Sequence, residues 1–138
     1  MGLAFRHKRR IQFAETDLAG VLHFSNYFRL MEEIEHAFFR SLGTCVISEA
    51  DGVTVSWPRV AAECEYRAPL RFEDEVELRL ILTHVGNKAL SYDVEFVLGD
   101  EVAATGKITA ICCATGPNGD FKSMRIPEAL RAKLSGQS

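Results

Sequence analysis

The sequence predicts an α+β domain in which one curved antiparallel sheet surrounds a single long helix. Two observations lead to this prediction. Between residues 27 and 42 the apolar residues recur at steps of three and four, and the later segments alternate apolar and polar residues. The helical stretch is apolar over more than one stripe, so we expect strands to enclose it. A chain of 138 residues is predicted to form one domain, spanning 1–138.

Composition narrows the class of protein. The chain is 47% hydrophobic and 25% charged, as globular proteins are, and its net charge of -3 argues against nucleic acid as a partner. We expect a cytoplasmic chain without a membrane segment, because no apolar run suits a signal peptide or a span. The cysteines show neither a CxxC pair nor zinc-finger spacing to histidine, so we predict no metal and no cofactor. They are Cys45, Cys64, Cys112 and Cys113, of which the last three are expected to be small core residues.

The first two elements are predicted to be a strand and the long helix. Residues 5–13 are strand-like, with Phe5, Ile11 and Phe13 on one face. The helix is expected to begin near Ser25 or Asn26, which are capping residue types, and to end before Gly43. Its apolar surface is predicted to contain Tyr27, Phe28, Leu30, Met31, Ile34, Ala37, Phe38, Phe39 and Leu42.

Strands are predicted for most of the remaining chain. After an expected loop at 44–56, alternating segments follow at 60–66, 76–82, 90–98 and 102–112. Gly86-Asn87 and Gly99-Asp100 are typical of tight hairpins, which makes these strands antiparallel. Pro127 indicates a short C-terminal helix. A sheet around one helix leaves free edges, which pairing with a second copy would cover.

The candidate site lies between the first strand and the helix. Asp17 follows the apolar strand, and Gly20 gives the backbone freedom to turn toward the helix. Backbone N–H groups at a helix N-terminus can polarise a carbonyl oxygen while a nearby carboxylate attacks the carbonyl carbon or directs water at it. A carboxylate and backbone N–H donors are enough for thioester hydrolysis, because an alkyl thiol, with a pKa of about 8.5, leaves without help from a strong general acid.

These residues give the chain a resemblance to the hotdog-fold thioesterases of the 4-hydroxybenzoyl-CoA thioesterase type. The resemblance covers residues 5–130. It rests on Phe13, Thr16-Asp17, Ala19-Gly20-Val21, Asn26-Tyr27, Glu32, the segment from Pro58 to Ala68 and the turn from His84 to Lys88. It implies a hotdog fold with about five strands, hydrolysis of an acyl-CoA to free acid and CoA, and a homodimer or homotetramer.

The resemblance also implies roles for individual residues. Asp17 takes the position of the catalytic carboxylate, as nucleophile or general base, and N–H groups near His23–Ser25 take that of the carbonyl-binding donors. Asn87 and Lys88 lie in the turn with which a neighbouring subunit contacts CoA, where the lysine would pair with phosphate. Some members have a histidine at Phe24; His23 is offset by one residue, so that role is not transferred. Substrate contacts are expected from Gly20, His23, Phe24, Ser25, Asn26, Tyr27 and Trp57.

Several alternatives remain open at this point. Asp17 and Gly20 also suit an ordinary turn, Tyr27 and Trp57 a core, and Lys88 a solvated turn. Another hotdog branch uses a glutamate on the helix, for which the candidates are Glu32, Glu33 and Glu35. An acyl-thioester dehydratase would need a histidine with a carboxylate. A non-catalytic acyl-thioester-binding module would not need Asp17. The acyl group, and its carrier (CoA or acyl carrier protein), stay undetermined.

Overall fold

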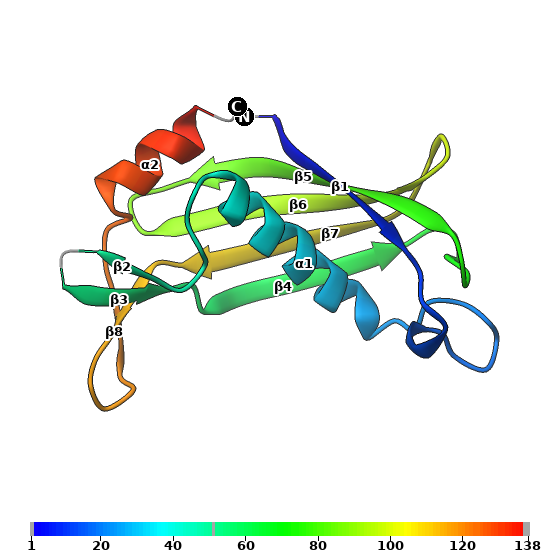
Figure 1. The fold of residues 1–138 in the computed structure, drawn as a ribbon, viewed down its shortest axis with the longest axis horizontal. Helices are drawn as coiled ribbons and strands as arrows, with labels where there is room; N and C mark the ends of the chain where they lie inside the picture. The colour runs from blue at the N-terminus through cyan, green and yellow to red at the C-terminus, as the bar shows by residue number, and fades with distance from the viewer. Residues whose placement is uncertain (1, 51, 137–138) are drawn as a thin grey trace.

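The computed structural model describes residues 2–50 and 52–136 and has an α+β fold with antiparallel sheets and two helices (Figure 1). The larger sheet has five strands in the order β1-β5-β6-β7-β4, and helix α1 (Asn26–Ser41) packs against one face of it. Every neighbouring pair in this sheet is antiparallel. Its strands are β1 (Leu3–Arg10), β4 (Arg59–Tyr66), β5 (Glu75–Val85), β6 (Ala89–Leu98) and β7 (Glu101–Ile111).

The alternation seen in the sequence is what builds the core. On β5 and β6 every second side chain faces α1 and is at most 1% exposed: Val76, Leu78, Leu80, Leu82, Leu90, Tyr92, Val94 and Phe96. Most of the predicted helix face is confirmed, and only Phe28 and Leu42 of it are half-buried. Its buried residues are Tyr27, Leu30, Met31, Ile34, Ala37, Phe38 and Phe39. Burial of this combined surface is the main force holding helix and sheet together.

Two glycines shape the position of α1. Gly106 on β7 lets the helix approach closely, because a Cβ there would stand only 2.1 Å from the Met31 sulfur. Gly43, with a φ of 81°, follows the last turn as predicted. The Gly43 N–H donates to the Arg40 carbonyl at 2.9 Å and the Thr44 N–H to the Phe39 carbonyl at 3.2 Å. This pair of bonds satisfies carbonyls that the helix end leaves without partners.

A second sheet was not foreseen. It has the order β2-β3-β8-β9, formed by β2 (Ser48–Ala50), β3 (Val53–Ser56), β8 (Cys113–Thr115) and β9 (Phe121–Ser123). The prediction of a loop over 44–56 is therefore wrong for β2 and β3. The extended state of β3 comes from pairing with β8, about 60 residues away, rather than from local preference, and β2 pairs in turn with β3. The hairpin turns after β5 and β6 and the helix α2 (Glu128–Ser135) after Pro127 are confirmed.

The start of the chain departs from the prediction in two places. β1 ends at Arg10, and Phe13–Glu15 form a 3-10 turn, η1, so Phe13 is 75% exposed rather than a core residue. The N–H of Ile11 bonds to the carbonyl of Asp74, which closes the ladder before Phe13. At the helix start, Ser25 occupies the cap position, but its side chain makes no capping bond.

The four cysteines are free thiols in three different settings. Cys112 and Cys113 are buried, Cys64 is half-buried and Cys45 is exposed. Burial raises the pKa of Cys64 and of Cys112 to about 11, which keeps both protonated and unreactive at neutral pH. Within residues 2–50 and 52–136, no helix is long and apolar enough to cross a bilayer, and no cluster of three metal-binding side chains occurs.

Candidate active site

Asp17 lies at the base of a tight exposed loop between η1 and α1. The Asp17 N–H donates to the Val21 carbonyl at 2.9 Å, and the Gly20 N–H donates to the Asp17 carbonyl at 2.9 Å. Gly20 has a φ of 80°, which favours glycine at this position. Oδ1 of Asp17 accepts the Ala19 N–H at 2.8 Å and the Val21 N–H at 3.4 Å. Oδ2 makes no hydrogen bond within the described part of the chain, so one carboxylate oxygen is available for chemistry.

The N-terminus of α1 presents an unused backbone donor beside this loop. The N–H groups of Ser25, Asn26 and Tyr27 have partners: the His23 Nδ1 at 3.2 Å, the His23 carbonyl at 2.9 Å and the Phe24 carbonyl at 3.4 Å. The Phe24 N–H has none among the residues that the structure describes. A free N–H at the positive end of a helix is suited to a carbonyl oxygen that gains negative charge.

Asp17 and Phe24 line the same cavity, of about 370 Å³. Tyr27 from α1 and Tyr66 from the end of β4 form another part of its wall, with ring centroids 4.7 Å apart. Tyr27 is 4% exposed, and burial raises its pKa to about 12, so its hydroxyl remains neutral. The cavity is lined mainly by apolar and aromatic residues together with Asp17 and Arg67, which suits an acyl group beside a reacting carbonyl.

The remaining predicted residues of the helix start hold the backbone in place. The Ser25 hydroxyl lies 2.8 Å from His23 Nδ1, and the His23 ring stacks on Phe24 at 4.6 Å. Because that nitrogen accepts the Ser25 N–H, its proton sits on Nε2 when the ring is neutral. Asn26 donates from Nδ2 to the Glu15 carbonyl at 2.8 Å. The structure therefore brings Asp17, Gly20, His23, Phe24, Ser25, Asn26 and Tyr27 into one region of the fold.

The three helix glutamates have different surroundings. Glu35 is 1% exposed and forms a bidentate pair with Arg59, with Nη1 and Oε2 2.9 Å apart. Glu33 pairs with Arg9, while Glu32 is largely exposed at 3.8 Å from Arg59. A carboxylate saturated by a guanidinium is a poor base or nucleophile. Of the candidate carboxylates, Asp17 is the one with a free oxygen in a cavity beside an open helix N-terminus.

Trp57, Asn87 and Lys88 lie far from Asp17 within one chain. Trp57 is buried against Phe39, with centroids 6.0 Å apart. The turn holding Asn87 and Lys88 follows the far end of β5, whose 11 residues span about 36 Å at roughly 3.3 Å each. The turn is fixed by Arg131 of α2, which donates to the carbonyls of Gly86 and Asn87 at 2.5 and 3.2 Å.

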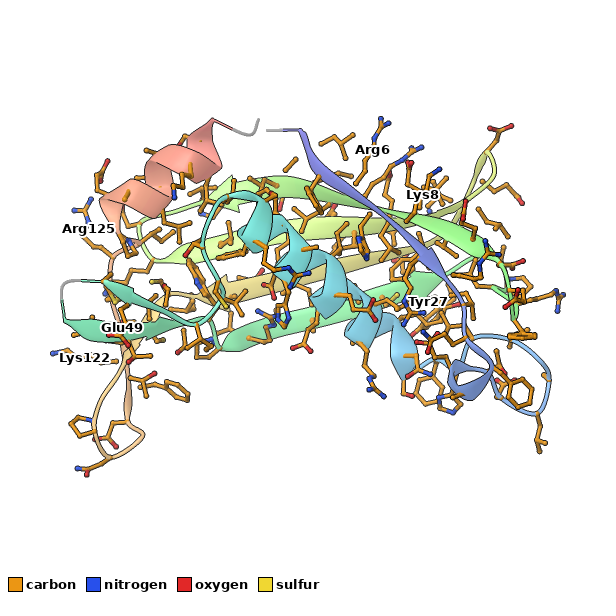
Figure 2. The ribbon with its side chains drawn as sticks, in the orientation of Figure 1. Arg6, Lys8, Tyr27, Glu49, Lys122 and Arg125 are labelled. Carbon is orange, nitrogen blue, oxygen red and sulfur yellow. The ribbon has the colours of Figure 1, made fainter. Side chains whose placement is uncertain are left out.

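Two further cations accompany Lys88 at that end. Figure 2 shows Lys122 and Arg125 on the side of the molecule opposite Tyr27, and both are exposed. Lys88 Nζ lies 3.4 Å from the Ser123 hydroxyl, which places the lysine beside this segment. Sequence reasoning missed Lys122 and Arg125, because two isolated basic residues between Pro117 and Pro127 form no pattern.

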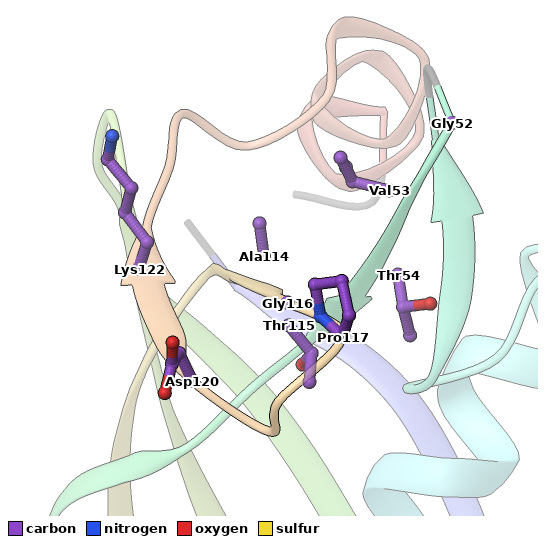
Figure 3. Close-up of a pocket in the computed structure, with 9 residues that line it drawn as sticks. All are labelled: Gly52, Val53, Thr54, Ala114, Thr115, Gly116, Pro117, Asp120 and Lys122. Carbon is purple, nitrogen blue, oxygen red and sulfur yellow. The ribbon is translucent and has the colours of Figure 1, made fainter.

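A second cavity occurs at the same end, between the strands of the smaller sheet (Figure 3). Its volume is about 610 Å³, and Val53, Thr54, Ala114, Thr115 and Lys122 are among the residues that line it. It contains Asp120 as its one described carboxylate and lies away from the Asp17 loop.

Comparison with known proteins identifies related sequences. A family model described as the thioesterase-like superfamily matches residues 11–134. An Aquifex aeolicus protein named as an esterase is 33% identical over 110 residues, covering 80% of this chain and 84% of that protein. A 1,4-dihydroxy-2-naphthoyl-CoA hydrolase of Synechococcus elongatus is 28% identical over 109 residues, covering 78% and 80%.

Solved structures agree with these matches. The structure of a gentisyl-coenzyme A thioesterase superposes with a TM-score of 0.80 at 27% identity, covering 92% of this chain and 99% of that one. A crystal structure of an Aquifex aeolicus protein superposes with a TM-score of 0.84 at 30% identity, covering 94% and 98%. The similarity spans both the sheet and the segment that contains Asp17.

Proposed function

This chain belongs to the thioesterase-like superfamily, and on that premise we propose that it hydrolyses an acyl-CoA thioester with Asp17 as its catalytic carboxylate. The observation that carries the proposal is one cavity lined by a carboxylate with a free oxygen and by the residue with an unused N–H at the helix start. The Phe24 N–H would stabilise the carbonyl oxygen as it becomes negative, and one such donor is worth about 3–4 kcal/mol of barrier.

Hydrolysis of the thioester can follow either of two routes. In one, Asp17 attacks the thioester carbon, the carbon–sulfur bond breaks to release the CoA thiolate, and water hydrolyses the resulting anhydride. In the other, Asp17 takes a proton from water, which attacks the same carbon and expels the same thiolate. Both routes use one carboxylate and one oxyanion donor, and neither needs a second acid, because the thiolate is a good leaving group.

We propose an aromatic acyl group as the substrate class. The cavity beside Asp17 is walled by Phe24, Tyr27 and Tyr66, whose rings can stack on another ring. Two relatives, at 27% and 28% identity, are named for gentisyl-CoA and for 1,4-dihydroxy-2-naphthoyl-CoA, both aromatic thioesters. An aromatic acyl-CoA is therefore expected to give a higher kcat/KM than an aliphatic acyl-CoA of similar size.

The complete site is proposed to form between two copies of the chain. β4 is an edge of the sheet, since β7 is its one partner among the described strands. The first half of β4 carries the exposed Val60, Ala61 and Ala62. Antiparallel pairing of two β4 strands about a two-fold axis would reverse one chain relative to the other. The Tyr66 end of one protomer, with Asp17 nearby, would then face the end of the other that carries Lys88.

The deciding experiment measures thiol release from a panel of aromatic and aliphatic acyl-CoAs. Asp17→Asn is expected to lose about 10²–10⁴-fold in kcat, because the replacement amide neither attacks nor accepts a proton. Asp74→Asn is the matched control. Its carboxylate also accepts a backbone N–H in a turn, from Arg71 at 2.8 Å, and the variant should keep wild-type turnover. A wild-type protein that binds acyl-CoA without releasing thiol would instead be a binding module.

A further inference from the structure

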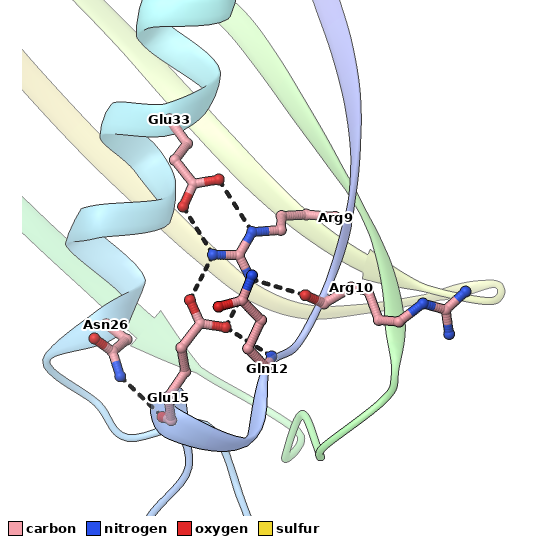
Figure 4. Close-up of polar contacts among 6 residues, drawn as sticks. All are labelled: Arg9, Arg10, Gln12, Glu15, Asn26 and Glu33. Carbon is pink, nitrogen blue, oxygen red and sulfur yellow. Dashed lines mark hydrogen bonds and ion pairs between the residues drawn. The ribbon is translucent and has the colours of Figure 1, made fainter.

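Arg9 on β1 uses all five N–H donors of its guanidinium (Figure 4). Nε donates to Glu33 Oε1 at 3.0 Å, and Nη2 donates to Glu33 Oε2 at 2.9 Å. Nη1 donates to Glu15 Oε1 at 2.6 Å and to the Arg10 carbonyl at 2.8 Å, while Nη2 also bonds Glu15 Oε2. One side chain thereby joins three elements: β1, the η1 turn ahead of Asp17, and α1.

Glu15 extends this connection to the start of the helix. Its Oε1 also accepts the Gln12 N–H at 2.8 Å, which fixes the side chain against η1. Its backbone carbonyl accepts the His23 N–H at 2.9 Å and Asn26 Nδ2 at 2.8 Å. Asp17 lies two residues after Glu15, and Phe24 lies between the two donors. The position of Glu15 therefore determines where the carboxylate and the Phe24 N–H stand relative to each other.

Resting on the proposed function, we infer that Arg9 is a positioning residue that holds the Asp17 loop and the α1 N-terminus in the mutual placement that hydrolysis requires. Its side chain is 14% exposed, so its bonds to Glu15 and Glu33 are partly shielded from water and salt. Charge-assisted bidentate bonds fix distance and orientation together. Lysine cannot replace this geometry, because one ammonium cannot pair bidentately with two carboxylates.

The structure offers a matched control in the next residue. Arg10 also lies on β1 and pairs with Glu75 at 3.3 Å, but both side chains are more than half exposed, and its other bond goes to the Glu73 carbonyl. Arg10→Gln removes the same charge from the same strand without touching Glu15. Any effect of overall charge or of β1 itself should appear equally in Arg9→Gln and Arg10→Gln.

The kinetic test compares kcat and KM for one acyl-CoA. Arg9→Gln is expected to lower kcat about 10–100-fold, since a displacement of 1 Å can cost 10²-fold, while KM changes by less than about threefold. Arg9→Lys should recover part of the loss, and Arg10→Gln should match the wild type. Wild-type kcat in folded Arg9→Gln would overturn the inference. If Arg9→Gln does not fold, Arg9→Lys provides the same comparison.

A second measurement needs no catalytic activity. Amide hydrogen exchange reports on the His23 N–H, whose bond to the Glu15 carbonyl depends on the bonds between Arg9 and Glu15. It also reports on the Val94 N–H in the middle of β6. In Arg9→Gln the exchange of His23 is expected to speed up about tenfold or more, while that of Val94 stays at the wild-type rate. Equal acceleration at both sites would mean that Arg9 only stabilises the fold. If the wild type releases no thiol, the proposed function fails. The exchange rates of His23 and Val94 still test whether Arg9 holds the Asp17 loop against the start of α1.

Discussion

The two ends of the five-stranded sheet differ in the side chains that they expose. The end near Asp17 exposes apolar side chains, with Phe13, Leu18, Phe24 and Phe72 between 48% and 108% exposed. The end beyond β5 exposes the cations Lys88, Lys122 and Arg125. One end suits an acyl group and the other suits phosphates, yet the length of β5 separates them in a single chain. This difference supports the proposal that one substrate molecule is held by two protomers.

The largest effect is expected when the intact Asp17 and the intact cationic end are placed on different chains. Asp17→Asn, and a Lys88→Ala, Arg125→Ala double variant, should each be weakly active alone at low substrate. Co-expressed in equal amounts, they form hybrids in which one site has both an intact Asp17 and an intact cationic end. Activity should rise to about a quarter of the wild type, because half of the dimers are hybrids with one good site in two.

Purified single-type dimers, mixed without subunit exchange, are the control for that experiment. Their activity should equal the sum of the two parents. If co-expressed material also gives only that sum, the two ends do not cooperate across protomers, and the two-chain site is refuted.

A smaller effect is expected when the cationic end is changed by itself. The Lys88→Ala, Arg125→Ala double variant should raise KM for acyl-CoA about tenfold with kcat unchanged, because a lost charge-assisted contact of about 1.4 kcal/mol weakens binding by that factor. Added salt should raise the wild-type KM more than the variant's. Lys8→Ala, which removes an exposed lysine from β1, should leave both parameters unchanged. An unaltered KM in the double variant would remove this end from the CoA site.

The smallest predicted effect concerns acid. Arg9 bonds to the Glu15 carboxylate and holds its pKa below the ordinary value of about 4.3. A depressed folded-state pKa gives stability that is present above the ordinary pKa and lost as pH falls through the folded-state value. As pH falls below about 5, the wild type should therefore lose more unfolding free energy than Arg9→Gln does.

Urea unfolding at a series of pH values measures this difference. Arg131→Gln is the comparison from the opposite end, since Arg131 bonds backbone carbonyls, which do not titrate. That variant should lower stability by the same amount at every pH. If the unfolding free energy of Arg9→Gln falls with decreasing pH as steeply as that of the wild type, the Arg9–Glu15 pair contributes nothing to acid sensitivity.

The main elements of the fold could be predicted because local and tertiary forces agree in them. Inward residues such as Leu78 and Leu80 alternate in sequence and are buried in space, and Gly43 has the left-handed backbone expected of a helix end. β3 could not be predicted, since its extended state depends on β8. Phe13 was misplaced because its strand ends at Arg10, which hydrophobicity alone does not reveal.

The candidate site was partly visible in the sequence for a similar reason. A single segment of the chain contains Asp17, Gly20 and the helix start, so the sequence indicates them together. The comparisons confirm membership of a thioester hydrolase family. Arg9, Glu15 and Glu33 come together only in three dimensions, as do Lys88 and Lys122. The sequence holds no spacing rule that would have linked them.

The two edges of the larger sheet have different consequences for the state of the protein in a crowded solution. β1 carries Arg6, Lys8 and Arg10, the first two labelled in Figure 2, and such charges discourage further strands from adding. After Arg59, β4 carries the small and apolar residues Val60, Ala61 and Ala62, which in the proposed dimer contact one partner. In the proposed dimer, a second β4 would occupy that edge about a two-fold axis, and both exposed edges would be covered together. Growth would then stop at a closed assembly, and the sheet would not seed fibres.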